Sequence, residues 1–123
     1  MNNKVYLKGR LGQDPDIRYL PSGDPVANFS LATNKNFKKD GEWKSITTWH
    51  KVVAFKFAAQ AAMNLSKGDM VIINGEIKVE KWEDKEGNKR ESVKINAFSI
   101  DKLAFIPKEA DSGSGNSTEE DPF

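Results

Sequence analysis

Hydrophobic residues alternate with polar ones along most of the chain, which is the pattern of strands buried on one face. This alternation predicts strands over residues 5–11, 27–33, 43–55, 71–79 and 93–97. After the last of these the apolar positions change phase, to Phe98 and Ile100, which indicates a β-bulge or a bend.

One segment departs from the alternation: residues 57–65 are rich in alanine and predict a single short helix, with Gly68 available to end the segment. Turn residues bracket a short stretch at 17–20, a loop tip is expected at 38–41, and a charged hairpin connection at 82–90. The expected order is β-β-β-α-β-β, with Gly9 and Gly75 suited to strong strand curvature. An all-β, five-stranded barrel of the oligonucleotide/oligosaccharide-binding type (OB-fold) fits this order, and a small sandwich is the alternative.

The 123 residues suffice for one domain, but charge and composition divide the chain. Residues 1–106 carry a net charge of +5, whereas residues 107–123 carry −4. Between Lys108 and Thr118 no aliphatic side chain is larger than that of Ala110, so this segment cannot offset the entropy of folding. We expect a folded domain over 1–106 and a disordered acidic tail over 107–123.

Composition and motifs argue against most enzymatic functions. The chain has no cysteine and a single histidine, His50, and it lacks the common phosphate-loop, dinucleotide and zinc-protease motifs. Residues 84–88 resemble a calcium loop only faintly, because the glycine is misplaced and no closing glutamate follows at the required distance. No metal, cofactor, small-molecule substrate or membrane contact is expected, and the default location is the cytoplasm. A small hydrolase that uses His50 is the enzymatic alternative.

Aromatic and basic residues interleave in the second half of the domain. On the long strand at 43–55, Trp49, Lys51 and Phe55 share one face and His50 lies on the other. Rings beside ammonium groups suit a surface on which nucleic-acid bases stack and phosphates meet positive charges. The alternative, for Phe55 and for Trp82, is that the rings pack in the core while neighbouring lysines reach out to water.

Several motifs occur in the order found in bacterial-type single-stranded DNA-binding proteins, and the chain resembles this family over residues 2 to about 104. They are Asn3-Lys4-Val5, Gly9 to Pro15, Arg18-Tyr19, Val26 to Asn34, Thr48 to Val53, Lys67-Gly68, Asn74-Gly75 and Lys81-Trp82, with Pro122-Phe123 matching separately. The resemblance implies an OB-fold, assembly as a homotetramer, and binding of single-stranded DNA without sequence preference. An RNA-binding or primosomal OB module is the nearest alternative.

The resemblance also implies roles for individual residues. The stacking aromatics correspond to Phe37, Trp49, Phe55 and Trp82, and the basic DNA-contact positions to Lys4, Lys51, Lys78 and Lys81. Tyr19 and His50 match positions near subunit contacts. Three residues depart from the family pattern: Phe37 replaces a common Trp, Glu80 a common basic residue, and Asp121 a common apolar one.

The end of the chain resembles the partner-docking tip of these proteins, formed by Glu119, Glu120, Asp121, Pro122 and Phe123. An aromatic end can enter an apolar pocket while the acids meet basic residues on a replication or repair protein. The alternative is a tail that only adds solubility. The implied role is in replication, recombination and repair, in a bacterial cell or in the bacterial host of a virus or mobile element.

Overall fold

The computed structural model describes residues 2–103 of the chain. Within that range it contains β1 (Val5–Leu11), β2 (Asp16–Tyr19), β3 (Pro25–Lys39), β4 (Glu42–Phe55), α1 (Phe57–Ala62), β5 (Met70–Glu83) and β6 (Lys89–Lys102). Five strands form one sheet in the order β1-β5-β6-β4-β3, and pairing of β1 with β3 closes this sheet into a barrel. The predicted five-stranded OB-fold is confirmed. The stretch at 17–20 contributes a further strand, β2, which pairs with the edge of β3 outside the barrel.

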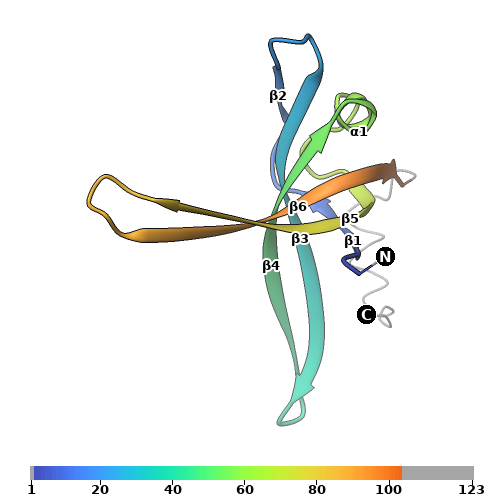
Figure 1. Ribbon diagram of the computed structural model, residues 1–123. Coiled ribbons are helices and arrows are strands. Elements are labelled where there is room, and N and C mark those ends of the chain that lie inside the picture. Colours follow the sequence, from blue (N-terminus) through green and yellow to red (C-terminus); the bar gives the residue numbers. More distant parts are fainter. Residues whose placement is uncertain (1, 104–123) are drawn as a thin grey trace.

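The two long hairpins continue beyond the barrel as two-stranded arms that point in different directions (Figure 1). We call residues 33–48 the β3–β4 arm and residues 76–94 the β5–β6 arm. β3, β5 and β6 are longer than predicted, because strand pairing continues through charged segments that carry no apolar pattern, whereas β4 has nearly the predicted extent. The loop tip expected at 38–41 is only Asp40 and Gly41, whose φ values of 52° and 81° suit a two-residue hairpin turn. The connection expected at 82–90 is likewise shorter, because Trp82 and Arg90 are strand partners.

The predicted change of phase near Phe98 is a β-bulge. The β5–β6 register moves from Asn74 opposite Ser99 to Gly75 opposite Ala97, so Phe98 has no partner. The extra residue lets both Ala97 and Ile100 face the core, where they are 4% and 8% exposed. Phe98 itself is left exposed on the surface.

The core lies inside the barrel and is formed by one face of each strand. Its largest fully buried side chains are Leu31, Val52, Val71 and Ile73. The helix ends at Ala62 rather than at residue 65, and it packs against β3, β4 and β6 through buried alanines. Among residues 2–103, no helix has the length and hydrophobicity needed to span a bilayer. The expected domain boundary at 106/107 and the tail lie outside the described residues.

Gly9 and Gly75 lie where backbones approach too closely for any side chain. A Cβ atom on Gly9 would lie 2.2 Å from the carbonyl oxygen of Ala32, close to the point where β1 meets β3. A Cβ atom on Gly75 would lie 2.2 Å from the carbonyl oxygen of Asn96, next to the bulge. The two glycines therefore permit the strand approach that barrel closure requires.

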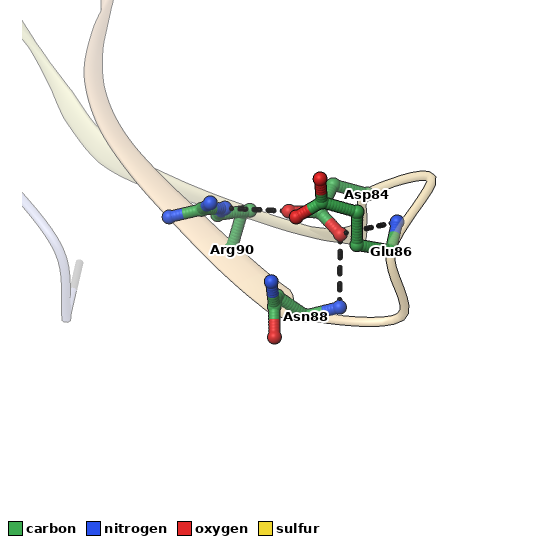
Figure 2. A network of polar contacts seen from close by, with 4 residues as sticks. All are labelled: Asp84, Glu86, Asn88 and Arg90. Carbon is green, nitrogen blue, oxygen red and sulfur yellow. Dashed lines mark hydrogen bonds and ion pairs between the residues drawn. The ribbon is translucent and has the colours of Figure 1, made fainter.

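The turn of the β5–β6 arm is organised by the carboxylate of Asp84 (Figure 2). The backbone N–H groups of Glu86 and Asn88 each donate to its Oδ1 at 2.9 Å, and Nε of Arg90 donates to its Oδ2 at 3.0 Å. The hydrogen bond from the Asn88 N–H is the main cause that holds the pKa of Asp84 below its ordinary value of 3.8. The carboxylate therefore stabilises the turn through three hydrogen bonds. Residues 2–103 contain no cluster of three or more His, Cys, Asp or Glu side chains able to hold a metal ion.

We predict that Gly75→Ala lowers the free energy of unfolding by about 3 kcal/mol, the upper end of the usual cost of overpacking. The matched comparison is Gly23→Ala, because Gly23 has a φ of 93° but no atom within 4 Å of the new Cβ. That substitution should cost only about 1 kcal/mol through backbone strain. Urea denaturation of both variants measures the difference, and equal losses would contradict the close approach at Gly75.

We predict that the Asp84 carboxyl titrates below 3.8, and that the amide signals of Glu86 and Asn88 shift in the same step. Because its pKa is lower in the folded state, the carboxylate stabilises the turn above pH 3.8, and this contribution is lost as the pH falls through the folded-state value. NMR titration of the carboxyl and amide groups measures both. Arg90→Gln should raise the pKa but leave the amide shifts coupled to it, since the backbone hydrogen bonds remain. Independent titration of the amides would contradict the arrangement.

Candidate nucleic-acid interface

The outward face of β4 carries the predicted aromatic and basic residues. Burial follows the alternation at four positions of this strand: Val52 and Ala54 are 2% and 0% exposed, whereas Trp49 and Phe55 are 60% and 40% exposed. Val53 is the exception, because it shares the face of the two rings and is buried. Lys51, between the two rings on the same face, is also exposed. Neither ring belongs to the buried core, so both have surface available for a ligand.

Trp82 of β5 and Trp49 of β4 line the same surface hollow. Trp82 is 50% exposed, and both indoles line one solvent-open hollow of about 430 Å³. The complete lining is Trp49, His50, Lys51, Trp82, Glu91, Ser92, Val93 and Ile95. Trp82 is thus brought from a distant part of the chain to form one concave surface with Trp49 and Lys51.

Gly12 leaves the space that the Trp49 ring needs. A Cβ atom on Gly12 would lie 2.5 Å from Cζ3 of Trp49 and 2.9 Å from Oγ of Ser30. The ring therefore lies directly against the backbone that follows β1, and a side chain at position 12 would displace it. Gly12 lies within the Gly9 to Pro15 motif, but the sequence alone predicted no role for it. Its close approach to Trp49 makes it a candidate functional residue.

The four predicted basic residues are all exposed, but they do not share one face. Lys51 lines the hollow, and alternation along β5 places Lys78 on the face of Trp82. Lys81 lies on the opposite face of β5, although together with Trp82 it lines a second hollow, of about 470 Å³. Lys4 precedes β1, where two hydrogen bonds between Asn3 and the backbone of residue 77, at 2.8 and 3.0 Å, hold this segment beside β5.

Glu80, the acidic departure in this region, is engaged in an ion pair. Nζ of Lys94 lies 3.1 Å from a carboxylate oxygen of Glu80, across the β5–β6 arm. Both side chains are on the Trp82 face of the arm by alternation. The pair reduces the positive charge that this face offers to a phosphate.

Phe37 does not join the other three aromatic residues. Its cross-strand partner is Lys44, whereas the partner of Trp49 is Ala32. Alternation therefore places Phe37 on the face of the β3–β4 arm that carries Ile46, opposite to the face of Trp49. The structure brings Trp49 and Trp82 together, with Phe55 further along the same face, and leaves Phe37 apart.

His50 is partly buried and, by alternation with Val52 and Ala54, lies on the inward face of β4. Its Nε2 is 2.9 Å from Oγ1 of Thr33, and partial burial lowers its pKa below the ordinary value of 6.5, so the ring is neutral at pH 7. It also lines a third hollow, of about 580 Å³, that includes Tyr6. Tyr6 is 62% exposed and is a candidate that sequence reasoning missed, although a lone aromatic on the lysine-bearing face of β1 was a usable signal.

Tyr19 does not lie near His50. It is 65% exposed and pairs with Pro25, whereas His50 pairs with Leu31. Six residues of an extended strand separate these two partners, a span of about 20 Å. The two predicted subunit-contact residues therefore belong to different parts of the surface. The predicted docking tip, Glu119 to Phe123, lies outside the described residues.

A closed five-stranded barrel with exposed aromatic and basic residues on its outer face belongs to the class of OB-fold proteins. Comparison with known families agrees, because the model of the single-strand binding protein family matches residues 2–103. The chain therefore belongs to the single-strand binding protein family. Proteins of this family are not enzymes, which removes the hydrolase alternative for His50.

The solved structures that are similar to this chain include two proteins that bind single-stranded DNA by name or by content. One is a Plasmodium falciparum protein of this family in complex with single-stranded DNA, with 32% sequence identity and a TM-score of 0.72 over 85% of this chain and 96% of that one. The other is a deletion mutant of the single-stranded DNA binding protein from Thermus aquaticus, with 30% identity and a TM-score of 0.73 over 83% of this chain. The match covers only 50% of the Thermus aquaticus chain, so this chain corresponds to about half of that protein.

Proposed function

We propose that this protein binds single-stranded DNA without sequence preference. The observation that carries the proposal is the hollow in which Trp49 and Trp82, both at least half exposed, lie beside Lys51. The similarity to a family member solved in complex with single-stranded DNA supports it. The protein acts by binding and protecting the strand.

The chemistry of binding follows from the residue types. Unpaired bases stack on the indole faces, an interaction that contributes about 1–3 kcal/mol per base and is open to every base because each has a π-face. Phe55 offers a further ring on the same outward face of β4. Lys51 and Lys78 meet phosphates, while Lys4 and Lys81 add positive charge around the path. No base edge needs to be read, so no sequence preference arises.

We further propose that the protein assembles as a homotetramer. One edge of β1 supports this: among the described residues, positions 5–9 of β1 pair with β5 only, which leaves their second edge available to another strand. The hollow that contains His50 and Tyr6 lies beside β1, and exposed Tyr19 offers a separate contact. A neutral His50 suits an interface, because no charge has to be desolvated there.

We also propose roles in replication, recombination and repair, in a bacterial cell or in the bacterial host of a virus or mobile element. The acidic tip Glu119-Glu120-Asp121-Pro122-Phe123 supports recruitment of partner proteins. Its terminal ring fits an apolar pocket, and its carboxylates fit a basic rim.

We predict that oligo-dT quenches the tryptophan fluorescence of the protein and binds more weakly as salt rises, with a log–log slope of about −0.7 per phosphate neutralised. Trp49→Ala and Trp82→Ala should each weaken binding by about 1–3 kcal/mol without unfolding the domain, because each removes one stacking ring. Titrations across salt, with oligomeric mass measured by sedimentation in parallel, provide the data.

Two controls complete this experiment. Ile46→Ala removes an exposed apolar side chain from the opposite face of β4 and should leave the affinity unchanged. Oligo-U of equal length separates a DNA-binding protein from an RNA-binding module, since the former does not require the 2′-hydroxyl. Absence of any binding at low salt would contradict the proposed function, and a monomeric mass would contradict the tetramer alone.

We predict that removal of Glu119 to Phe123 leaves the affinity for oligo-dT equal or slightly higher, because a competing polyanion is lost. The same change should abolish capture of replication and repair proteins. Phe123→Ala keeps the acids and should weaken capture without altering DNA affinity, which separates the apolar anchor from the charges. Pull-down with identification by mass spectrometry measures capture. Undiminished capture by both variants would leave only a solubilising role for the tip.

A further inference from the structure

Trp43 is the tryptophan that the hollow does not use. It lies at the outer end of the β3–β4 arm, next to the Asp40-Gly41 turn, and 73% of its surface is exposed. A single exposed apolar side chain is common on protein surfaces and by itself indicates no partner. What distinguishes Trp43 is its position on the arm relative to Trp49 and to the lysines of β3.

Trp43 and Trp49 lie on the same face of β4. They are six residues apart, an even number, and alternation places both side chains on one side of the strand. The cross-strand partners of this face are Ala32, Asn34, Asn36 and Lys38 of β3. Small and polar groups therefore separate the two indoles over a span of about 20 Å, and Oγ1 of Thr47 donates to Oδ1 of Asn34 at 2.7 Å within this span.

The charge of the two arms favours the β3–β4 arm as the continuation of a polyanion path. This arm carries Lys35, Lys38, Lys39 and Lys44 against Asp40 and Glu42. Among residues 2–103 its one ion pair joins Lys44 to Glu42 at 3.8 Å, so the three lysines of β3 are not neutralised. Of these three, Lys38 shares the face of Trp43, whereas alternation places Lys35 and Lys39 on the opposite face, where they add to the positive field of the arm without lying on the path itself.

The β5–β6 arm is different, because its charges balance. It carries six basic and six acidic residues. Two of its cations are paired across the arm, Arg90 with Asp84 at 3.0 Å and Lys94 with Glu80 at 3.1 Å. A strand of phosphates that leaves the hollow therefore gains more from the β3–β4 arm, where Lys38 lies directly opposite Trp43.

We propose that Trp43 is a further stacking site for single-stranded DNA, and that the bound strand leaves the hollow past Trp49 and runs outward along the β3–β4 arm to Trp43, with Lys38 on its phosphates. This inference rests on the proposed function and extends the binding path by the length of the arm. The site accepts any base, because the indole stacks on the face of the base and Lys38 attracts a phosphate. Neither contact distinguishes one base edge from another.

A variant with Trp43 as its only tryptophan tests the inference directly. Trp49→Phe combined with Trp82→Phe keeps an aromatic ring at each position of the hollow, and anisotropy of fluorescein-labelled oligo-dT of about 16 nucleotides, the upper end of the range for one OB-fold, reports binding independently. We expect the emission of Trp43 to be quenched in step with the rise in anisotropy. We also expect Trp43→Ala, in the otherwise unchanged protein, to weaken binding about fivefold or more. Trp43→Phe should retain most of the affinity, because a ring remains, and Ile46→Ala on the opposite face should have no effect.

The outcomes separate the inference from the proposed function. If labelled oligo-dT binds while the emission of Trp43 and the affinity of Trp43→Ala stay unchanged, the extended path is wrong and the proposed function stands. If the emission of Trp43 changes with protein concentration in the absence of DNA, a second copy of the chain covers the ring, and the inference is again overturned. If the unaltered protein fails to bind labelled oligo-dT at low salt, both fail.

Discussion

Closure of the barrel depends on a short contact between backbones. β1 remains paired with β5 through Arg10 and also reaches β3 through Arg10 and Leu11, so its last residues join the two ends of the sheet. Strand approach at this point leaves no room for a side chain at Gly9, and the bulge opposite Gly75 supplies the second bend. The geometry of the closed barrel then fixes where each hairpin leaves it. The meeting of Trp49 with Trp82, which come from two different hairpins, is a consequence of that closure.

Outside the barrel the arms have no core, and this explains why their rings stand in solvent. Each arm is a pair of strands whose two faces both meet water, so alternation no longer sorts residues into buried and exposed ones. The arms keep their shape through backbone pairing and through their turns, with two residues of positive φ in one arm and the Asp84 carboxylate in the other. A binding surface built on such arms offers aromatic faces at little cost to the stability of the barrel.

The charges are distributed as a polyanion-binding surface requires. Among residues 2–103, lysines without an ion pair gather on the β3–β4 arm, and Lys51 lines the hollow together with the two indoles. The β5–β6 arm instead compensates its own cations, and Glu80 contributes to this by its ion pair with Lys94. In the proposed complex, stacking therefore dominates near Trp82, while electrostatic attraction grows along the other arm. The acidic residues of 107–123 are complementary in sign to the domain that precedes them.

The sequence by itself determined the succession of the barrel strands and the helix along the chain, the irregularity at Phe98, the two glycines of closure and the outward face shared by Trp49, Lys51 and Phe55. These features depend on alternation and on backbone space, which are local properties of the chain. It did not reveal the full length of β3, β5 and β6, because paired strands in water need no apolar pattern. It also did not reveal the strand β2, which is too short for alternation to stand out. Only the tertiary structure decided that Trp82 joins Trp49 in one hollow, that Phe37 lies on the opposite face, and that Tyr6 rather than Tyr19 accompanies His50. These relations depend on strand register and on the closure of the sheet, which bring together residues that are distant in the chain.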